Sequence, residues 1–264
     1  MIERKTLSIA VISGKGGVGK TNITLNLGYA LYRAKQRVLM MDCDLGLANL
    51  DVLLGITPKA SIEQVFAGGI DLADIAVDLE PEGFSLLPAA SGLDVFNSPS
   101  PLQASVLERI NTYTATYDYC LLDVGAGITE AVQAFASKAM MRIVVITPEP
   151  TSITDAYALI KVLSSQHGVK DFYILVNQTE SPGEEKSSYG RLAAACDKFL
   201  GITLASLGSI RSDATFLEAV RRQIPLLKLS PSTPAAKDLI ATAVRIHRLH
   251  DSLETTQTAP LKTT

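Results

Sequence analysis

The sequence has few cysteines, no long apolar run and no strong excess of one charge. Its three cysteines, Cys43, Cys120 and Cys196, are far apart and odd in number, so they imply neither a disulfide framework nor a zinc quartet. We interpret Cys43 and Cys120 as small buried apolar groups, which fits a reduced cytosolic setting. No apolar stretch approaches the ~18 residues that a membrane-spanning helix needs.

Composition is that of an ordinary globular protein. Of the 264 residues, 47% are hydrophobic and 19% are charged, which suits one large α/β domain with its own core. The net charge of −3 gives no global basic bias toward nucleic acid, although a local basic patch on an assembled dimer stays open. We expect residues 1–254 to form a single domain and residues 255–264 a disordered tail.

A glycine-rich loop near the start carries the most specific signal. Residues 14–21 fit the phosphate-loop pattern G-x-x-x-x-G-K-[ST] at every fixed position, between an apolar strand at Leu7 to Ile12 and a helical pattern. Backbone N–H groups of such a loop face the phosphates. We expect Lys20 to reach the terminal phosphates and the Thr21 hydroxyl to hold Mg²⁺. The expected nucleotide-binding residues here are Gly14, Lys15, Gly16, Gly17, Val18, Gly19, Lys20, Thr21 and Asn22.

Apolar strands alternate with helical patterns along the rest of the chain. This alternation predicts a doubly wound, mostly parallel sheet with helices on both faces. We expect residues 61–66 to form a short helix, 68–81 to be irregular, 181–185 to form a mobile loop and 234–253 to form the last helix. The remaining strands are expected at 37–41, 84–87, 117–122, 141–146, 172–176 and 204–207.

Polar residues stand at the ends of several strands, where ligands bind in such sheets. They are Asp42, Asp44, Asp123, Glu149 and Asn177. Asp123 fits the carboxylate that supports Mg²⁺ beside Thr21, with a plain helix cap as the alternative. The Asn177 amide offers both a donor and an acceptor, which suits an adenine edge.

Asp42 and Asp44 flank Cys43, so in an extended segment they point to the same side. Paired carboxylates can bind a metal, share a proton or position water. An aspartate with a pKa near 3.9 is a poor base at neutral pH, but phosphoryl transfer needs mainly positioning and charge stabilisation. A solvated loop with a helix cap is the alternative.

Lys15 directly follows the first glycine, giving K-G-G-x-x-K-[ST]. This loop resembles the deviant Walker A loop of the MinD/ParA ATPases, and the resemblance extends from Ser8 to about Leu249. It implies slow hydrolysis of ATP with Mg²⁺, and an ATP-sandwich homodimer in which Lys15 touches the partner's phosphates. The same resemblance implies that Asp44 orients the attacking water and Asp42 supports the Mg²⁺ shell.

The resemblance also assigns the remaining site residues. Gly125 and Gly127 would form a second switch that senses the γ-phosphate. Asn177 would contact the base, and the segment containing Arg211 and Asp213 would form the other wall of the base pocket. The implied catalytic residues are Lys15, Lys20 and Asp44, and the implied metal residues are Thr21, Asp42 and Asp123.

Two stretches, residues 121–128 and 147–161, are similar to the flagellum-number regulators called FlhG, FleN or YlxH. This implies control of flagellar number or placement through an FlhF-type GTPase, C-ring components or a flagellar transcription regulator. Only six residues precede Leu7, and the Asp-Gln-Ala…Leu-Arg pattern of many such regulators is missing, which speaks against direct FlhF activation. A ParA-type or MinD-type partitioning or division-site ATPase is the alternative.

Two further classes fit less well. A metal-cluster carrier would need paired cysteines such as C-x-x-C, and a non-catalytic module would not need Lys20, Thr21, Asp44 and Asp123. We favour a last helix packed on the sheet over one that lies on anionic lipid at the inner face of the membrane. His247 and His250 are expected on the surface.

Overall fold

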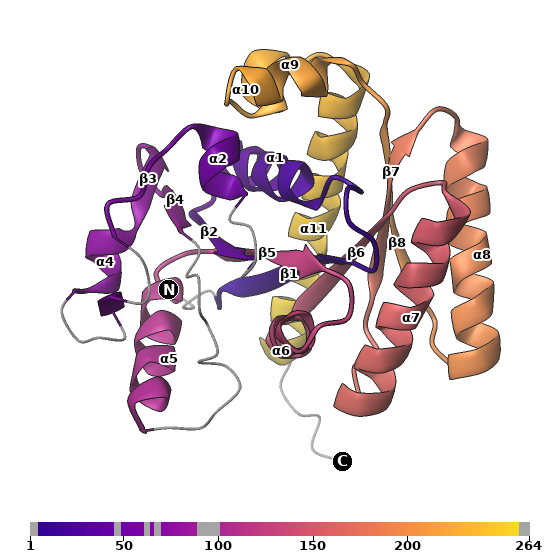
Figure 1. The fold of residues 1–264 in the computed structure, drawn as a ribbon, viewed down its shortest axis with the longest axis horizontal. Coiled ribbons are helices and arrows are strands. Elements are labelled where there is room, and N and C mark those ends of the chain that lie inside the picture. Colours follow the sequence, from indigo (N-terminus) through magenta and orange to yellow (C-terminus); the bar gives the residue numbers. More distant parts are fainter. Residues whose placement is uncertain (1–4, 45–48, 61–63, 66–69, 89–100, 259–264) are drawn as a thin grey trace.

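The computed structural model describes residues 5–44, 49–60, 64–65, 70–88 and 101–258. Its eight strands form one sheet in the order β3-β4-β2-β5-β1-β6-β7-β8, with helices on both faces (Figure 1). Among these strands only β3 and β4 pair antiparallel. The expected doubly wound, mostly parallel sheet is therefore confirmed.

The strands are β1 (Leu7–Ser13), β2 (Val38–Cys43), β3 (Val77–Glu80), β4 (Phe84–Leu87), β5 (Tyr119–Ala126), β6 (Met141–Ile146), β7 (Tyr173–Thr179) and β8 (Ala205–Arg211). The helices are α1 (Lys20–Arg33), α2 (Leu50–Leu54), α4 (Leu72–Ile75), α5 (Pro101–Thr114), α6 (Glu130–Lys138), α7 (Pro150–His167), α8 (Pro182–Leu200), α9 (Thr215–Arg221), α10 (Leu226–Leu229) and α11 (Pro234–Thr258).

The central strand β1 supplies side chains to two separate cores. Ala10 and Ile12 belong to the core beneath α6, α7 and α8, whereas Ile9 and Val11 belong to the core beneath α1 and α11. Successive side chains of a strand point to opposite faces, so a strand covered on both sides must be apolar throughout. All three cysteines are free and buried, as expected for Cys43 and Cys120.

Two segments differ from the sequence-based expectation. Residues 70–81, expected to be irregular, contain α4 and the edge strand β3, which pairs with β4. Residues 181–185, expected to form a loop, begin α8, because Ser181 accepts a hydrogen bond from the Glu184 amide and Pro182 suits the first helical position. The expected helix at 61–66 lies largely outside the described residues.

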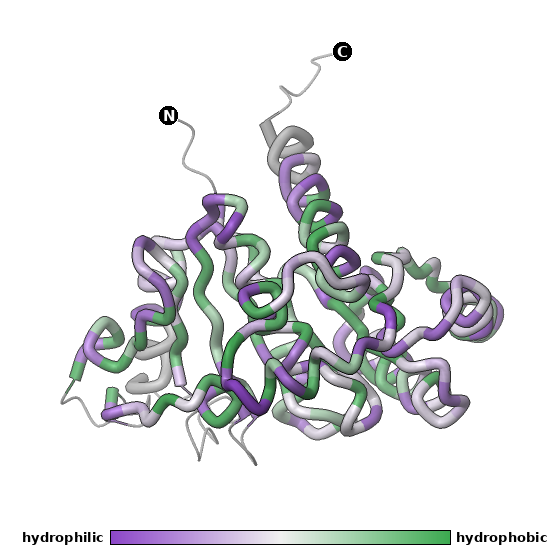
Figure 2. Tube along the Cα trace, turned by 90° about the horizontal axis from the view of Figure 1, so that it is seen from above, coloured by the Kyte–Doolittle hydropathy of each residue, from purple (hydrophilic) through white to green (hydrophobic). Residues whose placement is uncertain are grey.

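The last helix packs on the sheet, as favoured. Leu239, Ala243 and Ile246 are buried against the α1 face, and α11 extends beyond the sheet (Figure 2). The expectation for His250 was wrong: it is buried, with Nε2 bonded to the Lys5 carbonyl. His247 Nδ1 shares a hydrogen bond with the Tyr119 hydroxyl. Residues 255–258, assigned to the tail, continue the helix, and 259–264 lie outside the described residues.

Within the described part of the chain, no helix is long and apolar enough to cross a bilayer. The two edges of the sheet are β3 and β8. The Leu207 carbonyl on β8 accepts a hydrogen bond from Arg245 of α11, and Arg211 at the end of β8 pairs with Asp238 of the same helix.

Candidate nucleotide site

The glycine-rich loop joins β1 to α1, and its glycines are needed for different reasons. A Cβ at Gly14 would lie 2.2 Å from the backbone carbonyl of Asp155 in α7, so the loop rests directly on that helix. Gly19 precedes α1 with a φ of 93°, and a Cβ there would lie 2.5 Å from Asn177 Nδ2. Larger residues fit at neither position, whereas the space beside Gly16 is open.

Lys20, the first residue of α1, is held at the end of β1. Its Nζ donates to Ser13 Oγ at 3.0 Å, and its residue is only 9% exposed. Burial lowers the pKa of Lys20, while the charges of Asp123 and Asp44 oppose this effect. A partly desolvated ammonium group interacts more strongly with an anion than a solvated one, which suits a group that contacts phosphate.

Asp123 lies on β5 next to this lysine and is 1% exposed. Burial raises the pKa of Asp123 to about 7, although Thr21, Lys20 and Thr24 favour its charged form. Thr24 Oγ1 donates to Asp123 Oδ1 at 3.1 Å. A buried carboxylate beside the Thr21 hydroxyl is a hard oxygen donor set that fits Mg²⁺. Such an ion would neutralise charge on the nucleotide phosphates.

Asp42 is opposite Asp123 in the β2–β5 register, so the expected convergence of these strand ends is confirmed. Its Oδ1 accepts the Asp44 amide at 3.0 Å, and its Oδ2 accepts the Asn49 and Leu50 amides at 2.9 and 3.0 Å. Asp42 therefore holds the segment that leads into α2. The alternative role of Asp42, in a loop that caps a helix, therefore fits these contacts. If Asp42 also supports the Mg²⁺ shell, it would do so by positioning this loop.

Asp44 faces the second glycine loop. Its Oδ2 accepts a hydrogen bond from Asn49 Nδ2 at 3.4 Å, and a Cβ at Gly125 would lie 3.4 Å from Asp44 Oδ1. The Gly127 amide donates to the Ser13 carbonyl at 2.9 Å, which ties this loop to the end of β1. The two expected switch segments are thus in contact beside the phosphate loop.

Asp44 and the loop border a cavity of about 750 Å³. Its other walls come from α2, the end of β5 and the end of α9. Sequence reasoning missed five of the lining residues, because no motif marks the short helices α2 and α9 or the turn after α9 that carry them: Val52, Leu53, Val220, Arg221 and Gln223. Among the described residues, no group of three His, Cys, Asp or Glu side chains gathers as a metal site. An ion here would therefore depend on hydroxyl, water and phosphate oxygens as well.

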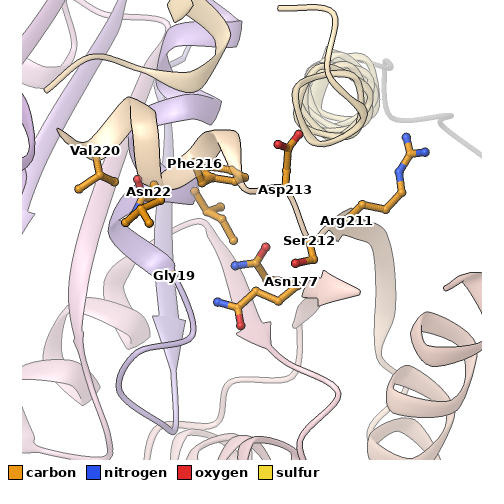
Figure 3. A pocket seen from close by; sticks show the side chains of 11 residues that line it. Gly19, Asn22, Asn177, Arg211, Ser212, Asp213, Phe216 and Val220 are labelled. Atoms are coloured by element: carbon orange, nitrogen blue, oxygen red, sulfur yellow. The ribbon is translucent and has the colours of Figure 1, made fainter. Parts of the chain in front are cut away.

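A second, adjoining cavity of about 310 Å³ lies beside Gly19 (Figure 3). Asn177 Nδ2 donates to the Val18 carbonyl at 2.8 Å. Because a carbonyl can only accept, the donor end of this amide is turned to the loop, which leaves Oδ1 as an acceptor for an adenine amino group. Phe216 of α9, which sequence reasoning missed, supplies an aromatic side chain to the same cavity.

Arg211 and Asp213 also border this cavity, but their side chains are engaged elsewhere. The Arg211 guanidinium pairs with the Asp238 carboxylate at 2.7 Å, and Figure 3 shows it extending away from Asn177 and Phe216. Asp213 Oδ1 accepts the Thr215 amide at 2.9 Å near the start of α9. The segment forms a wall of this cavity, but the side-chain ends of Arg211 and Asp213 are bonded to Asp238 and Thr215.

Lys15 does not extend into the cavity of its own protomer. Its Nζ forms an ion pair with Glu149 and donates to Thr151 Oγ1 at 3.0 Å, both at the start of α7. To reach a nucleotide bound by another molecule, Lys15 would have to give up these contacts with Glu149 and Thr151.

Together, the fold and site define a P-loop nucleotide-binding ATPase. The chain belongs to the CobQ/CobB/MinD/ParA nucleotide binding domain family, whose model matches residues 9–226. Among curated proteins, it is 40% identical over 239 residues to the antiactivator FleN of Pseudomonas aeruginosa, covering 90% of this chain and 85% of that one. It is 36% identical to the flagellum site-determining protein YlxH of Helicobacter pylori, covering 86% and 77% of the two chains.

Solved structures of MinD proteins have the same fold as this chain. The MinC:MinD cell division protein complex of Aquifex aeolicus has a chain with a TM-score of 0.73 and 30% identity, covering 92% of this chain and 96% of that one. MinD of Pyrococcus horikoshii, solved as a complex with Mg-ADP, gives a TM-score of 0.72 and 26% identity, covering 92% and 97%. The expected MinD/ParA resemblance is confirmed.

Proposed function

We propose that the protein is a Mg·ATP-dependent dimerising switch that regulates flagellar number or placement. The observation that carries the ATPase site is the convergence of Lys20, Thr21 and Asp44 on one cavity, with Asp123 buried beside Lys20 and Thr21. In this proposal Lys20 holds the terminal phosphates, Asp44 orients the attacking water, and Thr21 and Asp123 support Mg²⁺. The adenine base occupies the cavity between Asn177 and Phe216.

The proposed dimer is formed by two copies that face each other across their nucleotides, each giving its Lys15 to the other's phosphates. The flagellar output is supported by the similarity to FleN and YlxH, whose names describe an antiactivator and a flagellum site-determining protein. A flagellar transcription regulator, C-ring components and an FlhF-type GTPase are the candidate partners. We place the protein in the cytoplasm, where these partners act; binding of anionic vesicles by the ATP-bound form tests a lipid contact by α11.

Phosphate release and light scattering with ATP test the switch. The wild type should hydrolyse ATP slowly and double its mass with ATP. Lys15→Ala should bind ATP as a monomer, and Asp44→Ala should form a dimer that persists. A monomeric wild type with ATP, or an unchanged ATP dimer in Lys15→Ala, contradicts the proposed dimer. The persistent Asp44→Ala dimer then serves as bait for purified C-ring and transcription-regulator candidates.

The similarity to MinD supports a division-site or partitioning role as the second candidate. A partitioning ATPase of this fold binds DNA non-specifically, with an affinity that falls steeply with salt. Binding of the ATP dimer to random duplex DNA or to anionic vesicles, together with failure to bind any flagellar candidate, would favour this second role.

A further inference from the structure

Gln223, in the turn that follows α9, has an uncommon backbone conformation. Its φ is 55°, in the left-handed region that residues other than glycine seldom occupy, and its amide donates to the Val220 carbonyl at 3.0 Å. The residue lines the larger cavity, together with residues of the phosphate loop and α2.

The Gln223 side chain closes the C-terminal end of α2. Its Nε2 donates to the Val52 carbonyl at 3.1 Å. Gly55, the left-handed residue that ends α2, donates its amide to the same carbonyl at 3.2 Å. A Cβ at Gly55 would lie 2.3 Å from Gln223 Oε1, so the glutamine amide lies directly against the glycine backbone.

The other end of α2 is held by Asp42 and Asp44. Asp42 accepts the Asn49 and Leu50 amides, and the Asn49 side chain donates to Asp44. A helix of five residues is far too short to be stable alone, so its position depends on the packing of Leu50 in the core and on the hydrogen bonds at its two ends. The α2 helix thus extends from the proposed water-orienting aspartate to the end of α9.

The same helix α9 borders the proposed base pocket through Phe216 and Val220. We propose that Gln223 is a positioning residue that couples occupation of the base pocket to the placement of Asp44. A base against α9 fixes that helix, Gln223 holds α2 to it, and α2 fixes the segment that carries Asp44. The proposal rests on the proposed function, which places the base in this pocket and the phosphates beside Lys20.

Substitutions that remove the donor but keep the length of the side chain test the coupling. Gln223→Met removes the hydrogen bond, and Gln223→Glu turns a charged acceptor toward the Val52 carbonyl. Gln223 is exposed, so both variants should fold. We expect kcat for ATP to fall about three- to tenfold in Gln223→Met, and further in Gln223→Glu, with ADP affinity within about twofold of wild type. Arg222→Ala is the matched control. Arg222 directly precedes Gln223, and its substitution removes only an exposed ion pair with Glu218.

Hydrogen exchange separates coupling from a merely structural role. The Leu53, Gly55 and Ile56 amides are hydrogen-bonded within the α2 segment, and their exchange reports how firmly it is held. In the proposed binding mode ADP fills both cavities, whereas pyrophosphate fills only the phosphate site. In wild type, ADP should slow exchange at these amides more than pyrophosphate does. In Gln223→Met that difference should disappear, although ADP still binds.

A structural role alone would raise exchange equally with both ligands and leave the difference intact, which would overturn the inference. Equal protection by ADP and pyrophosphate in the wild type would also overturn it. If the wild type bound neither ligand, the nucleotide site itself would be wrong, and the proposed function would fail before this inference is reached.

Discussion

Lys15 of the phosphate loop is paired with Glu149, the residue that precedes α7. The two side chains are 36% and 59% exposed, so the pair is solvated and contributes modestly to stability. Because Lys15 also donates to Thr151, two contacts must break before its ammonium group can reach the phosphates of a second copy. In the proposed dimer, the start of α7 would therefore compete with the partner's phosphates for the same cation.

Glu149→Gln should favour the ATP-dependent dimer. Removing one charge of an exposed pair is expected to lower the protein concentration at half-dimerisation by up to about fivefold. Sedimentation velocity with a non-hydrolysable ATP analogue measures this midpoint. Glu184→Gln, which changes an acidic residue in the first turn of α8, is the control. A midpoint unchanged by Glu149→Gln, or shifted equally in the control, argues against competition.

Asp44→Asn should slow hydrolysis without preventing ATP binding. The variant keeps the hydrogen-bonding shape beside Asn49 but removes the charge that would orient water, so we expect kcat to fall by about 10² or more. Single-turnover hydrolysis and ATP affinity are the two measurements. Asp51→Asn, a carboxylate on α2 that contacts the Val52 amide, should keep near-normal turnover. Normal single-turnover rates in Asp44→Asn would remove Asp44 from the mechanism.

Asp123→Asn should separate the stability of the fold from Mg²⁺ binding. The raised pKa of about 7 means that the folded protein holds this proton more tightly than the unfolded chain does. Stability is therefore lost as pH rises from about 4 through 7, and at pH 8 the buried charge is a net cost. We expect the nucleotide-free variant at pH 8 to be at least as stable as wild type in urea.

The same variant should lose most of the Mg²⁺-dependent increase in melting temperature that ADP gives the wild type. A variant that is clearly less stable than wild type without ligand would show that the carboxylate mainly supports the fold. Full retention of the Mg²⁺ effect would show that Asp123 does not support the ion.

Asn177→Ala should weaken the phosphate loop as well as the base pocket. It leaves the Val18 carbonyl without its side-chain donor, at a cost of about 1–3 kcal/mol for a buried group. Calorimetry should show weaker binding of pyrophosphate and a larger loss for ADP, because only ADP also reaches the acceptor end of the amide. Wild-type affinity for pyrophosphate would show that the loop does not need this anchor.

The sequence predicted those site residues that stand at strand ends. Asp42, Asp123 and Asn177 follow apolar runs, and a parallel sheet brings the ends of such runs to one edge. Phe216 and Gln223 could not be found this way, because they line the two cavities only through the position of α9 beside the loop and α2. That placement depends on packing between distant segments, which periodicity does not encode.

His250 shows a signal that was present and misjudged. Leu239, Ala243, Ile246 and His250 follow the three- and four-residue spacing of one helical face, and all are buried. The prediction of a surface position rests on the polarity of histidine and disregards this spacing. Burial is possible because its Nε2 finds the Lys5 carbonyl, a partner 245 residues away that only the folded chain supplies.

In the described part of the sheet, both edge strands carry features that discourage pairing with a further strand. At one margin β3 has only four residues and carries Asp78 and Glu80, and such short, charged strands discourage pairing. At the other, α11 engages β8 through Arg245 and through Asp238. These features disfavour a dimer in which edge strands of two molecules pair to form one continuous β-sheet. In the proposed switch, association is left to the loop-bearing end, where it would be made and undone with each nucleotide.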